Sequence, residues 1–227
     1  MNPIRIAAIA DVHCPRYLNE FNLALSKCNK PDLFLFAGDM INRGKIDEYT
    51  NVLDAVEVQF GQDVPLIACF GNEDPPIHRD ELAALTEGRV TLLDDDSVTI
   101  TIAKSSVTII GMSVVVSNLS SESSVEIRGV FEERAKQLKR LLRSAKGSGN
   151  IVILLMHFSP LQETRPSEYT WWVAEAVSQY PPNAIIHGHL HDAPREKVEI
   201  GATTIWNVAL PINKSITEID YWDTKMT

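Results

Sequence analysis

Aspartate, asparagine and histidine side chains gather in five short motifs, and each motif directly follows an apolar run. The motifs are Asp11-Val12-His13, Gly38-Asp39, Gly71-Asn72, His157 and Gly188-His189-Leu190-His191. Such side chains offer mixed oxygen and nitrogen ligands to borderline divalent ions: manganese first, with iron, cobalt, nickel or zinc as alternatives. Two ions about 3.5 to 4 Å apart can orient a phosphate, activate a water molecule and stabilise the charge of an in-line displacement. The residue types therefore indicate a two-metal centre suited to phosphoester chemistry.

The apolar runs before these motifs predict the strands that position them. They cover residues 4–10, 33–37, 66–70, 151–156 and 184–186. In an open α/β sheet, the residues that follow the carboxyl ends of the strands converge on one crevice. We therefore expect ligands scattered over the sequence to meet at one edge of the sheets.

Helical and extended patterns alternate between these runs. Apolar side chains recur at helical spacing over residues 17–28, 46–60 and 131–145, and strand patterns cover residues 98–102, 107–110, 198–200, 203–208 and 216–220. A serine-rich stretch, residues 113–124, favours local hydrogen bonds and predicts a loop. The order predicts an α/β protein that starts as βαβαβ.

Composition limits the class of protein further. A chain of 227 residues with 44% hydrophobic residues suits a single domain over residues 1–227. Its net charge of -9 gives no strong signal for nucleic-acid binding, and no apolar run approaches the ~20 residues that span a bilayer. Three cysteines without a CxxC pair argue against a disulfide framework and favour the cytoplasm. The oligomeric state is not indicated.

The motifs carry more weight together than singly. Asp-x-His alone is a weak signal, and a single His157 or His189 would most often be a hydrogen-bonded core histidine. Their fixed order and their positions after strands make a shared metal site the better interpretation. Asp39 is the natural bridging ligand, because its carboxylate has two oxygens and lies between the first and third motifs.

The ordered set resembles the calcineurin-like metallophosphoesterase superfamily, and the resemblance covers residues 11–191. It implies a four-layer αββα sandwich, with two mixed β-sheets flanked by helices, and a dinuclear metal site. The implied ligands are Asp11, His13 and His191 for one ion, Asn72, His157 and His189 for the other, and Asp39 as the bridge.

Two further residues receive roles from the same resemblance. Residues 38–44 resemble the family's Gly-Asp-x-Val-Asp-Arg-Gly segment, which implies that Arg43 contacts phosphate; a salt bridge that stabilises the loop is the alternative. The third motif departs from the family, since Glu73 stands where a histidine usually helps to protonate the leaving oxygen. Glu73 is therefore either a catalytic acid or a loop-stabilising residue.

We accordingly expect a metal-dependent phosphoesterase that uses metal-bound hydroxide on small phosphorylated substrates, phosphodiesters first, without a covalent intermediate. Phosphomonoesters or nucleotide pyrophosphates are the alternatives within the same chemistry. The alternative from another class is a non-catalytic interaction scaffold, similar to the retromer subunit that uses this fold to bind proteins. Neither a membrane nor a nucleic-acid partner is predicted.

Overall fold

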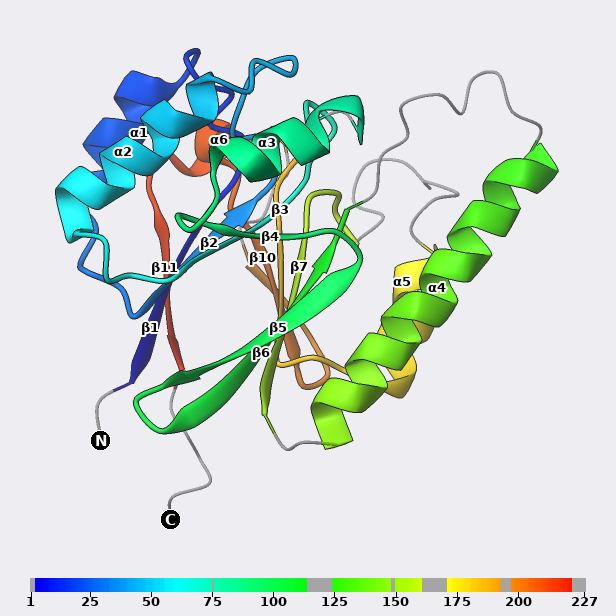
Figure 1. The fold of residues 1–227 in the computed structure, drawn as a ribbon. Helices are drawn as coiled ribbons and strands as arrows, with labels where there is room; N and C mark the ends of the chain where they lie inside the picture. Colours follow the sequence, from blue (N-terminus) through cyan, green and yellow to red (C-terminus); the bar gives the residue numbers. More distant parts are fainter. Residues whose placement is uncertain are drawn as a thin grey trace.

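The structure is a computed structural model that describes residues 3–74, 76–113, 124–147, 150–160, 171–192 and 197–221. It contains two mixed β-sheets with helices on their outer sides (Figure 1). The loop predicted over residues 113–124 lies almost entirely outside the described residues.

The first sheet has five strands in the order β11-β1-β2-β3-β4. Their bounds are Thr217–Tyr221, Ile4–Ile9, Leu33–Ala37, Leu66–Cys69 and Thr91–Leu93. β1 to β4 are parallel, and β11 pairs antiparallel with β1. The carboxyl ends of β1, β2 and β3 therefore share one edge.

The second sheet has six strands in the order β5-β6-β7-β8-β10-β9. Their bounds are Asp96–Ile102, Ser105–Met112, Ile151–Met156, Ala184–His187, Thr203–Asn207 and Lys197–Ile200. β6, β7, β8 and β10 are parallel, whereas β5 and β9 form antiparallel pairs at the two margins.

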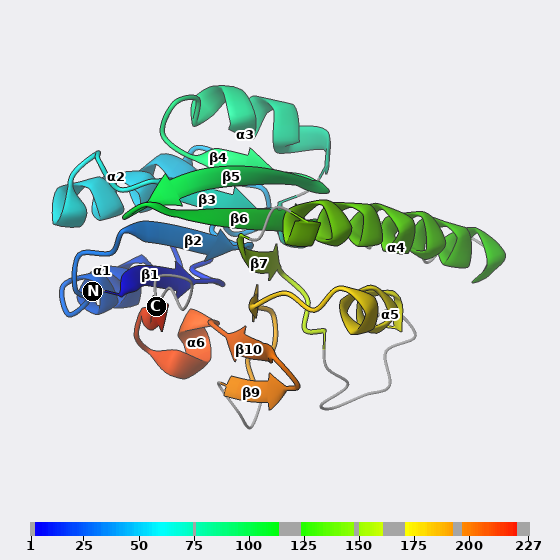
Figure 2. The ribbon, with the colours of Figure 1, turned by 90° about the horizontal axis from the view of Figure 1, so that it is seen from below.

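The helices fall into two groups on opposite sides of the sheets. In chain order they are α1 (Leu18–Leu25), α2 (Glu48–Phe60), the 3-10 turn η1 (Pro76–His78), α3 (Arg79–Leu85), α4 (Ser124–Gly147), α5 (Trp171–Gln179) and α6 (Leu210–Asn213). α1 and α2 lie on one side, and α4 and α5 lie on the other (Figure 2). None of the described helices has the length and apolarity that a membrane-spanning segment needs.

The alternation of side chains along each strand explains the layers. In β1, Ile6 and Ala8 join the core between the two sheets, while Ala7 and Ile9 join the core beneath α1 and α2. Because successive strand residues point to opposite faces, an apolar strand can serve two cores at once. A third core joins the outer face of the second sheet to α4 and α5. The predicted four-layer αββα sandwich is confirmed.

Candidate metal centre

All seven proposed ligands follow strands at the shared carboxyl edge. Asp11 and Asp39 come two residues after β1 and β2, and Asn72 comes three residues after β3. His157 directly follows β7, and the pair His189 and His191 follows β8. The chain thus delivers three ligand segments from the first sheet and two from the second.

Asp11 is in contact with two of these histidines. Its Oδ1 lies 2.9 Å from Nε2 of His191 and 3.6 Å from Nε2 of His13. The Asp11 carboxylate is buried, whereas the His191 side chain is 40% exposed, so this group reaches from the core to the surface. One carboxylate and two imidazoles can therefore converge on a single ion.

Asp39 lies between the histidines of the two proposed ion positions. Its Oδ2 lies 3.3 Å from Nε2 of His157 and 3.9 Å from Nε2 of His13. Its Oδ1 accepts the backbone N–H of Glu73 at 2.8 Å. That hydrogen bond fixes the carboxylate and leaves Oδ2 facing both imidazoles.

Asn72 and His189 complete the set around His157. Nε2 of His157 lies 3.0 Å from Oδ1 of Asn72, and Nδ1 of the same ring donates to the carbonyl oxygen of Ala37 at 2.9 Å. The His189 ring lies 5.1 Å from the His157 ring, and its backbone N–H donates to Oδ2 of Asp11 at 2.9 Å. The seven side chains thus form one connected group.

Several of these residues have a left-handed backbone conformation, which residues other than glycine rarely adopt. The φ angles are 61° at Asp11, 44° at His13, 54° at Asp39 and 68° at His189. Such a conformation costs on the order of 1–3 kcal/mol per residue and persists only where the surroundings hold it. Its concentration at these four positions supports a functional role for the strand-end turns.

Two glycines let the backbone approach the carboxylates closely. A Cβ atom on Gly71 would lie 2.0 Å from Oδ1 of Asp39, and one on Gly188 would lie 2.4 Å from Oδ2 of Asp11. Both distances are far shorter than any non-bonded contact, so any side chain at either position would displace a carboxylate. The glycines of the third and fifth motifs are therefore part of the site.

A family comparison agrees with this geometry. Residues 4–193 match the Metallophos family, described as calcineurin-like phosphoesterase. The chain belongs to this family. Membership implies a metal-dependent phosphoesterase. No curated protein sequence matches the chain significantly.

Solved structures with the same fold share little sequence with this metallophosphoesterase. A dimetal phosphatase from Danio rerio is 14% identical, with a TM-score of 0.63, and the match covers 98% of this chain and 94% of that one. The protein TT1561 of Thermus thermophilus is 13% identical, with a TM-score of 0.61 and coverage of 96% and 99%. A putative 5'-nucleotidase from Staphylococcus aureus is 14% identical, with a TM-score of 0.61 and coverage of 95% and 50%. At these identities the likeness shows the fold alone.

The residues of this metallophosphoesterase fit a bound cation. Oδ1 of Asp11 is buried and, although His191 is close, receives no well-oriented hydrogen bond from the described residues. Buried carboxylate oxygens are normally paired, because leaving one unpaired is costly. Within the described residues, two groups of ligand atoms are close enough to hold an ion: Asp11, His13 and His191, and Asp11, Asp39 and His157.

The pKa values indicate a site that takes up positive charge. Burial opposes protonation of His157, but the negative charge of Asp39 outweighs it and raises the pKa of His157 to about 9. Burial also opposes ionisation of Asp11, yet the contacts with His13 and His191 hold the pKa of Asp11 well below its ordinary value. By contrast, burial and the charge of His157 lower the pKa of His189 to about 4. Without metal, protons on histidines balance the carboxylates.

Metal binding should therefore release protons. As a proposed ligand, His157 would have to lose this proton to bind an ion, so about one proton should leave per protein at about pH 7.5. The apparent affinity for Mn2+ should rise from about pH 6.5 towards the pKa of His157 at about 9 and level off above it, where His157 is already deprotonated. Calorimetric titration in two buffers with different protonation enthalpies measures the release. Binding heats that do not depend on the buffer would contradict it.

Asp74 supports the centre but was not among the predicted site residues. Its buried carboxylate accepts the backbone N–H groups of Gly71 at 2.8 Å and Asp39 at 3.2 Å through Oδ2. Burial, followed by the negative charge of Asp39, raises the pKa of Asp74 to about 6. Asp74 therefore connects the second and third motifs, and the sequence signal was its place two residues after Asn72.

Phe158 was also missed, because an aromatic residue after His157 carries no metal-binding signal. Its ring lies 4.4 Å from the His189 ring and 5.4 Å from the His157 ring. Such aromatic contacts stabilise a fixed ring orientation. Phe158 therefore packs against two proposed ligands and limits their rotation.

Glu73 and Arg43 are neighbours in the structure. Oε2 of Glu73 accepts a hydrogen bond from the backbone N–H of Arg43 at 2.6 Å. The backbone carbonyl oxygen of Glu73 accepts one from the backbone N–H of Gly44 at 2.9 Å. Glu73 therefore holds the loop that follows Asp39. The Arg43 guanidinium is exposed and forms no salt bridge within the described part of the chain. The alternative of a loop-stabilising salt bridge for Arg43 has no support among these residues.

Proposed function

We propose that this protein is a dinuclear metallophosphoesterase that hydrolyses small phosphodiesters. The observation that carries the proposal is the position of Asp39, whose Oδ2 lies near His157 and His13 at 3.3 and 3.9 Å. His13 follows β1 of the first sheet, and His157 follows β7 of the second. A carboxylate between histidines of the two proposed ligand groups suits a pair of cations better than one.

We assign the ligands as the family resemblance implies. Asp11, His13 and His191 would hold one ion, Asn72, His157 and His189 would hold the other, and Asp39 would be shared. Manganese is our first choice of metal. Iron, cobalt, nickel and zinc are the alternatives, because mixed oxygen and nitrogen ligands suit all of these ions. The bound ions would supply positive charge that orients the phosphate and lowers the pKa of coordinated water.

The protein's own groups would then position the substrate. The exposed Arg43 guanidinium can offer two parallel N–H groups to two phosphate oxygens, a geometry that lysine lacks. Glu73 keeps the Arg43 backbone in place through its 2.6 Å hydrogen bond. Arg43 would thus contact the phosphate, and Glu73 would position the arginine.

The substrate proposal has alternatives. Phosphodiesters come first, and phosphomonoesters or nucleotide pyrophosphates come second, since the proposed ligands recognise only the phosphate. Among the structural neighbours, a phosphatase and a putative 5'-nucleotidase favour the second choice by analogy alone. A non-catalytic scaffold is disfavoured, because a scaffold has no need of seven converging metal ligands.

Metal content and turnover test the proposal together. The purified protein should bind close to two Mn2+ ions per chain and hydrolyse bis-(p-nitrophenyl) phosphate faster than p-nitrophenyl phosphate. Removing metal with a chelator should abolish turnover, and adding Mn2+ back should restore it. Faster turnover of the monoester would favour the phosphatase alternative. Binding of metal without any turnover across a panel of phosphate esters would favour the scaffold.

Glu73→His should change the dependence of the rate on the leaving group. A histidine could protonate a poor leaving group, an effect worth roughly 10²–10⁴-fold in general acid catalysis. We expect the wild-type protein to cleave p-nitrophenyl esters much faster than alkyl esters, and Glu73→His to improve the alkyl esters by about tenfold or more.

The control for this variant is Glu87→His, because Glu87 is an exposed loop residue outside the centre. Rates are measured for esters with graded leaving-group pKa. If the wild type and Glu73→His show the same dependence, position 73 has no leaving-group role. Its only function would then be the loop contact with Arg43.

We also propose a cytoplasmic protein of one domain. Cys14, Cys28 and Cys69 are all free and buried. Unpaired buried cysteines suit a reducing compartment. Both sheets share one continuous core, which supports a single domain over the whole chain.

A further inference from the structure

Two cations beside the proposed metal centre have no acidic partner in the described part of the chain. About half of the Lys and Arg side chains in the described residues form salt bridges, as Lys30 does with Asp63 at 2.8 Å. Arg16 and Lys214 are exposed, and neither has a carboxylate within salt-bridge distance among the described residues. Their charge is therefore available to an anion.

Both cations lie against the same aromatic ring. Cζ of Arg16 is 4.8 Å from the centre of the Tyr17 ring, and Nζ of Lys214 is 5.8 Å from it. The Tyr17 ring lies in turn 6.3 Å from the His13 ring, with the two planes at 61°. Cation–π contact holds a cation in place without neutralising it. Tyr17 thus places two free positive charges next to a proposed metal ligand.

Backbone hydrogen bonds connect these residues to the ligand segment. The N–H of Arg16 donates to the carbonyl oxygen of His13 at 2.8 Å, and that of Tyr17 donates to Val12 at 3.2 Å. Arg16 and Tyr17 are therefore fixed to the turn that carries His13.

Lys214 reaches the same place from the far end of the chain. It follows α6, and its N–H donates to the carbonyl oxygen of Leu210 at 3.0 Å. The N–H of Leu210 donates at 3.0 Å to Ala10, the residue before Asp11. Segments about 200 positions apart thus hold the two cations at one rim of the centre.

We infer that Arg16, Tyr17 and Lys214 form a subsite for a second phosphate group on the substrate, beside the His13 side of the metal centre. This inference rests on the proposed function, since it assumes that the reacting phosphate occupies the centre. The substrate class is a small organic phosphate with two separate phosphate groups, such as a nucleoside bisphosphate. A phosphate at this rim would receive charge-assisted hydrogen bonds from Arg16 and Lys214.

The test compares two nucleotides that differ by one phosphate. Thymidine 3',5'-bisphosphate and thymidine 5'-monophosphate are titrated by calorimetry into the Mn2+-loaded protein. We expect the bisphosphate to bind about tenfold more tightly than the monophosphate. An effect of this size is expected from one or two partly exposed contacts between a cation and a phosphate. The double variant Arg16→Gln/Lys214→Gln should bind the two nucleotides with similar affinity. Raising the salt concentration should also reduce the preference of the wild type.

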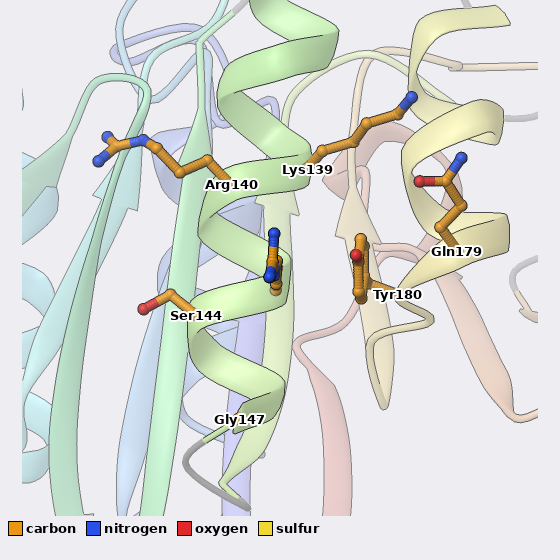
Figure 3. Close-up of a pocket in the computed structure, with 7 residues that line it drawn as sticks. Lys139, Arg140, Ser144, Gly147, Gln179 and Tyr180 are labelled. Atoms are coloured by element: carbon orange, nitrogen blue, oxygen red, sulfur yellow. The ribbon is translucent and has the colours of Figure 1, made fainter.

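A matched control comes from a second group of basic side chains. A cavity of about 550 Å³ between α4 and α5 is lined by Lys139, Arg140, Arg143 and Tyr180, among others (Figure 3). It adjoins Gly147, which precedes the amino end of β7, whereas His157 follows the carboxyl end of that strand. Arg143→Gln therefore removes an exposed arginine at the opposite edge of the sheet, and the preference for bisphosphate should survive.

Three results would overturn the subsite: equal affinities in the wild type, a preference that persists in the double variant, or a preference that Arg143→Gln abolishes. Failure of the proposed function would look different. The protein would then keep its preference for bisphosphate in calorimetry but hydrolyse no phosphate ester. The binding measurement thus judges the subsite without relying on turnover.

Discussion

Replacing Asp39 by asparagine should weaken metal binding at both proposed positions, and turnover should fall at least about a hundredfold. Oδ2 of Asp39 lies near both His157 and His13, so a neutral amide removes charge from both ion positions at once. The fold should tolerate the change, because asparagine also adopts the left-handed backbone observed at Asp39. Its amide oxygen can still accept the Glu73 N–H. Metal titration with Mn2+ and turnover of bis-(p-nitrophenyl) phosphate measure the effect.

Asp32→Asn is the matched control for this variant. Asp32 lies at the opposite end of β2 and accepts the backbone N–H of Arg5 at 2.8 Å. Asp32→Asn removes the same charge beside the other end of β2, so a general effect of net charge would appear in both variants. Metal binding and turnover should remain unchanged in Asp32→Asn.

His191→Ala provides the comparison that separates the two ions. His191 contacts Asp11 and His13, which belong to one proposed ion position, so its loss should weaken that position more than the other. Asp39→Asn should weaken both. If neither variant changed the stoichiometry or the affinity for metal, the assignment of these ligands would be wrong.

Much of this centre could be predicted from the sequence because its ligands follow apolar strands. The runs over residues 33–37 and 151–156 match β2 and β7 residue for residue, and the other three end within one residue of their strands. When a polar motif follows an apolar strand, the sequence predicts both the local structure of the ligand residues and their place at the edge of the sheet. The layer order followed from the family resemblance and not from periodicity alone.

Short elements and long-range contacts could not be predicted in the same way. α3 and β4 are only seven and three residues long, so neither gives a clear periodic signal. The role of Asp74 depends on two backbone N–H groups from different motifs, which meet only in the folded chain. Similarly, Lys214 reaches Tyr17 through α6, and nothing in the local sequence relates the two.

The sequence left two roles open for Glu73, and one contact in the structure bears on them. Its carboxylate accepts the Arg43 N–H, which supports the loop-stabilising role without testing the catalytic one. The two roles are compatible only if the second carboxylate oxygen reaches a substrate. The ester series proposed above for Glu73→His separates them.

Gly71→Ala should also damage the centre severely, although it adds a single methyl group. The new Cβ would lie 2.0 Å from Oδ1 of Asp39 and 2.6 Å from its backbone nitrogen, so the backbone must move as well as the carboxylate. Overpacking of this kind costs about 1–3 kcal/mol of stability. A shift of about 1 Å at a catalytic group can cost roughly a hundredfold in rate. We therefore expect turnover to fall about a hundredfold, together with a weaker affinity for Mn2+.

Gly129→Ala is the control, because a Cβ on Gly129 would meet no atom of the described residues within 4 Å outside its chain neighbours and its own helix backbone. Gly129 lies within α4, where alanine should stabilise the fold by about 0.5–1 kcal/mol and leave turnover unchanged. Thermal unfolding and metal titration of both variants separate damage to the site from damage to the fold. Loss of Mn2+ affinity in Gly71→Ala, with most of the stability retained, would show that this glycine serves the position of Asp39. Normal turnover in Gly71→Ala would mean that the close approach of Gly71 to Asp39 is not required for the reaction.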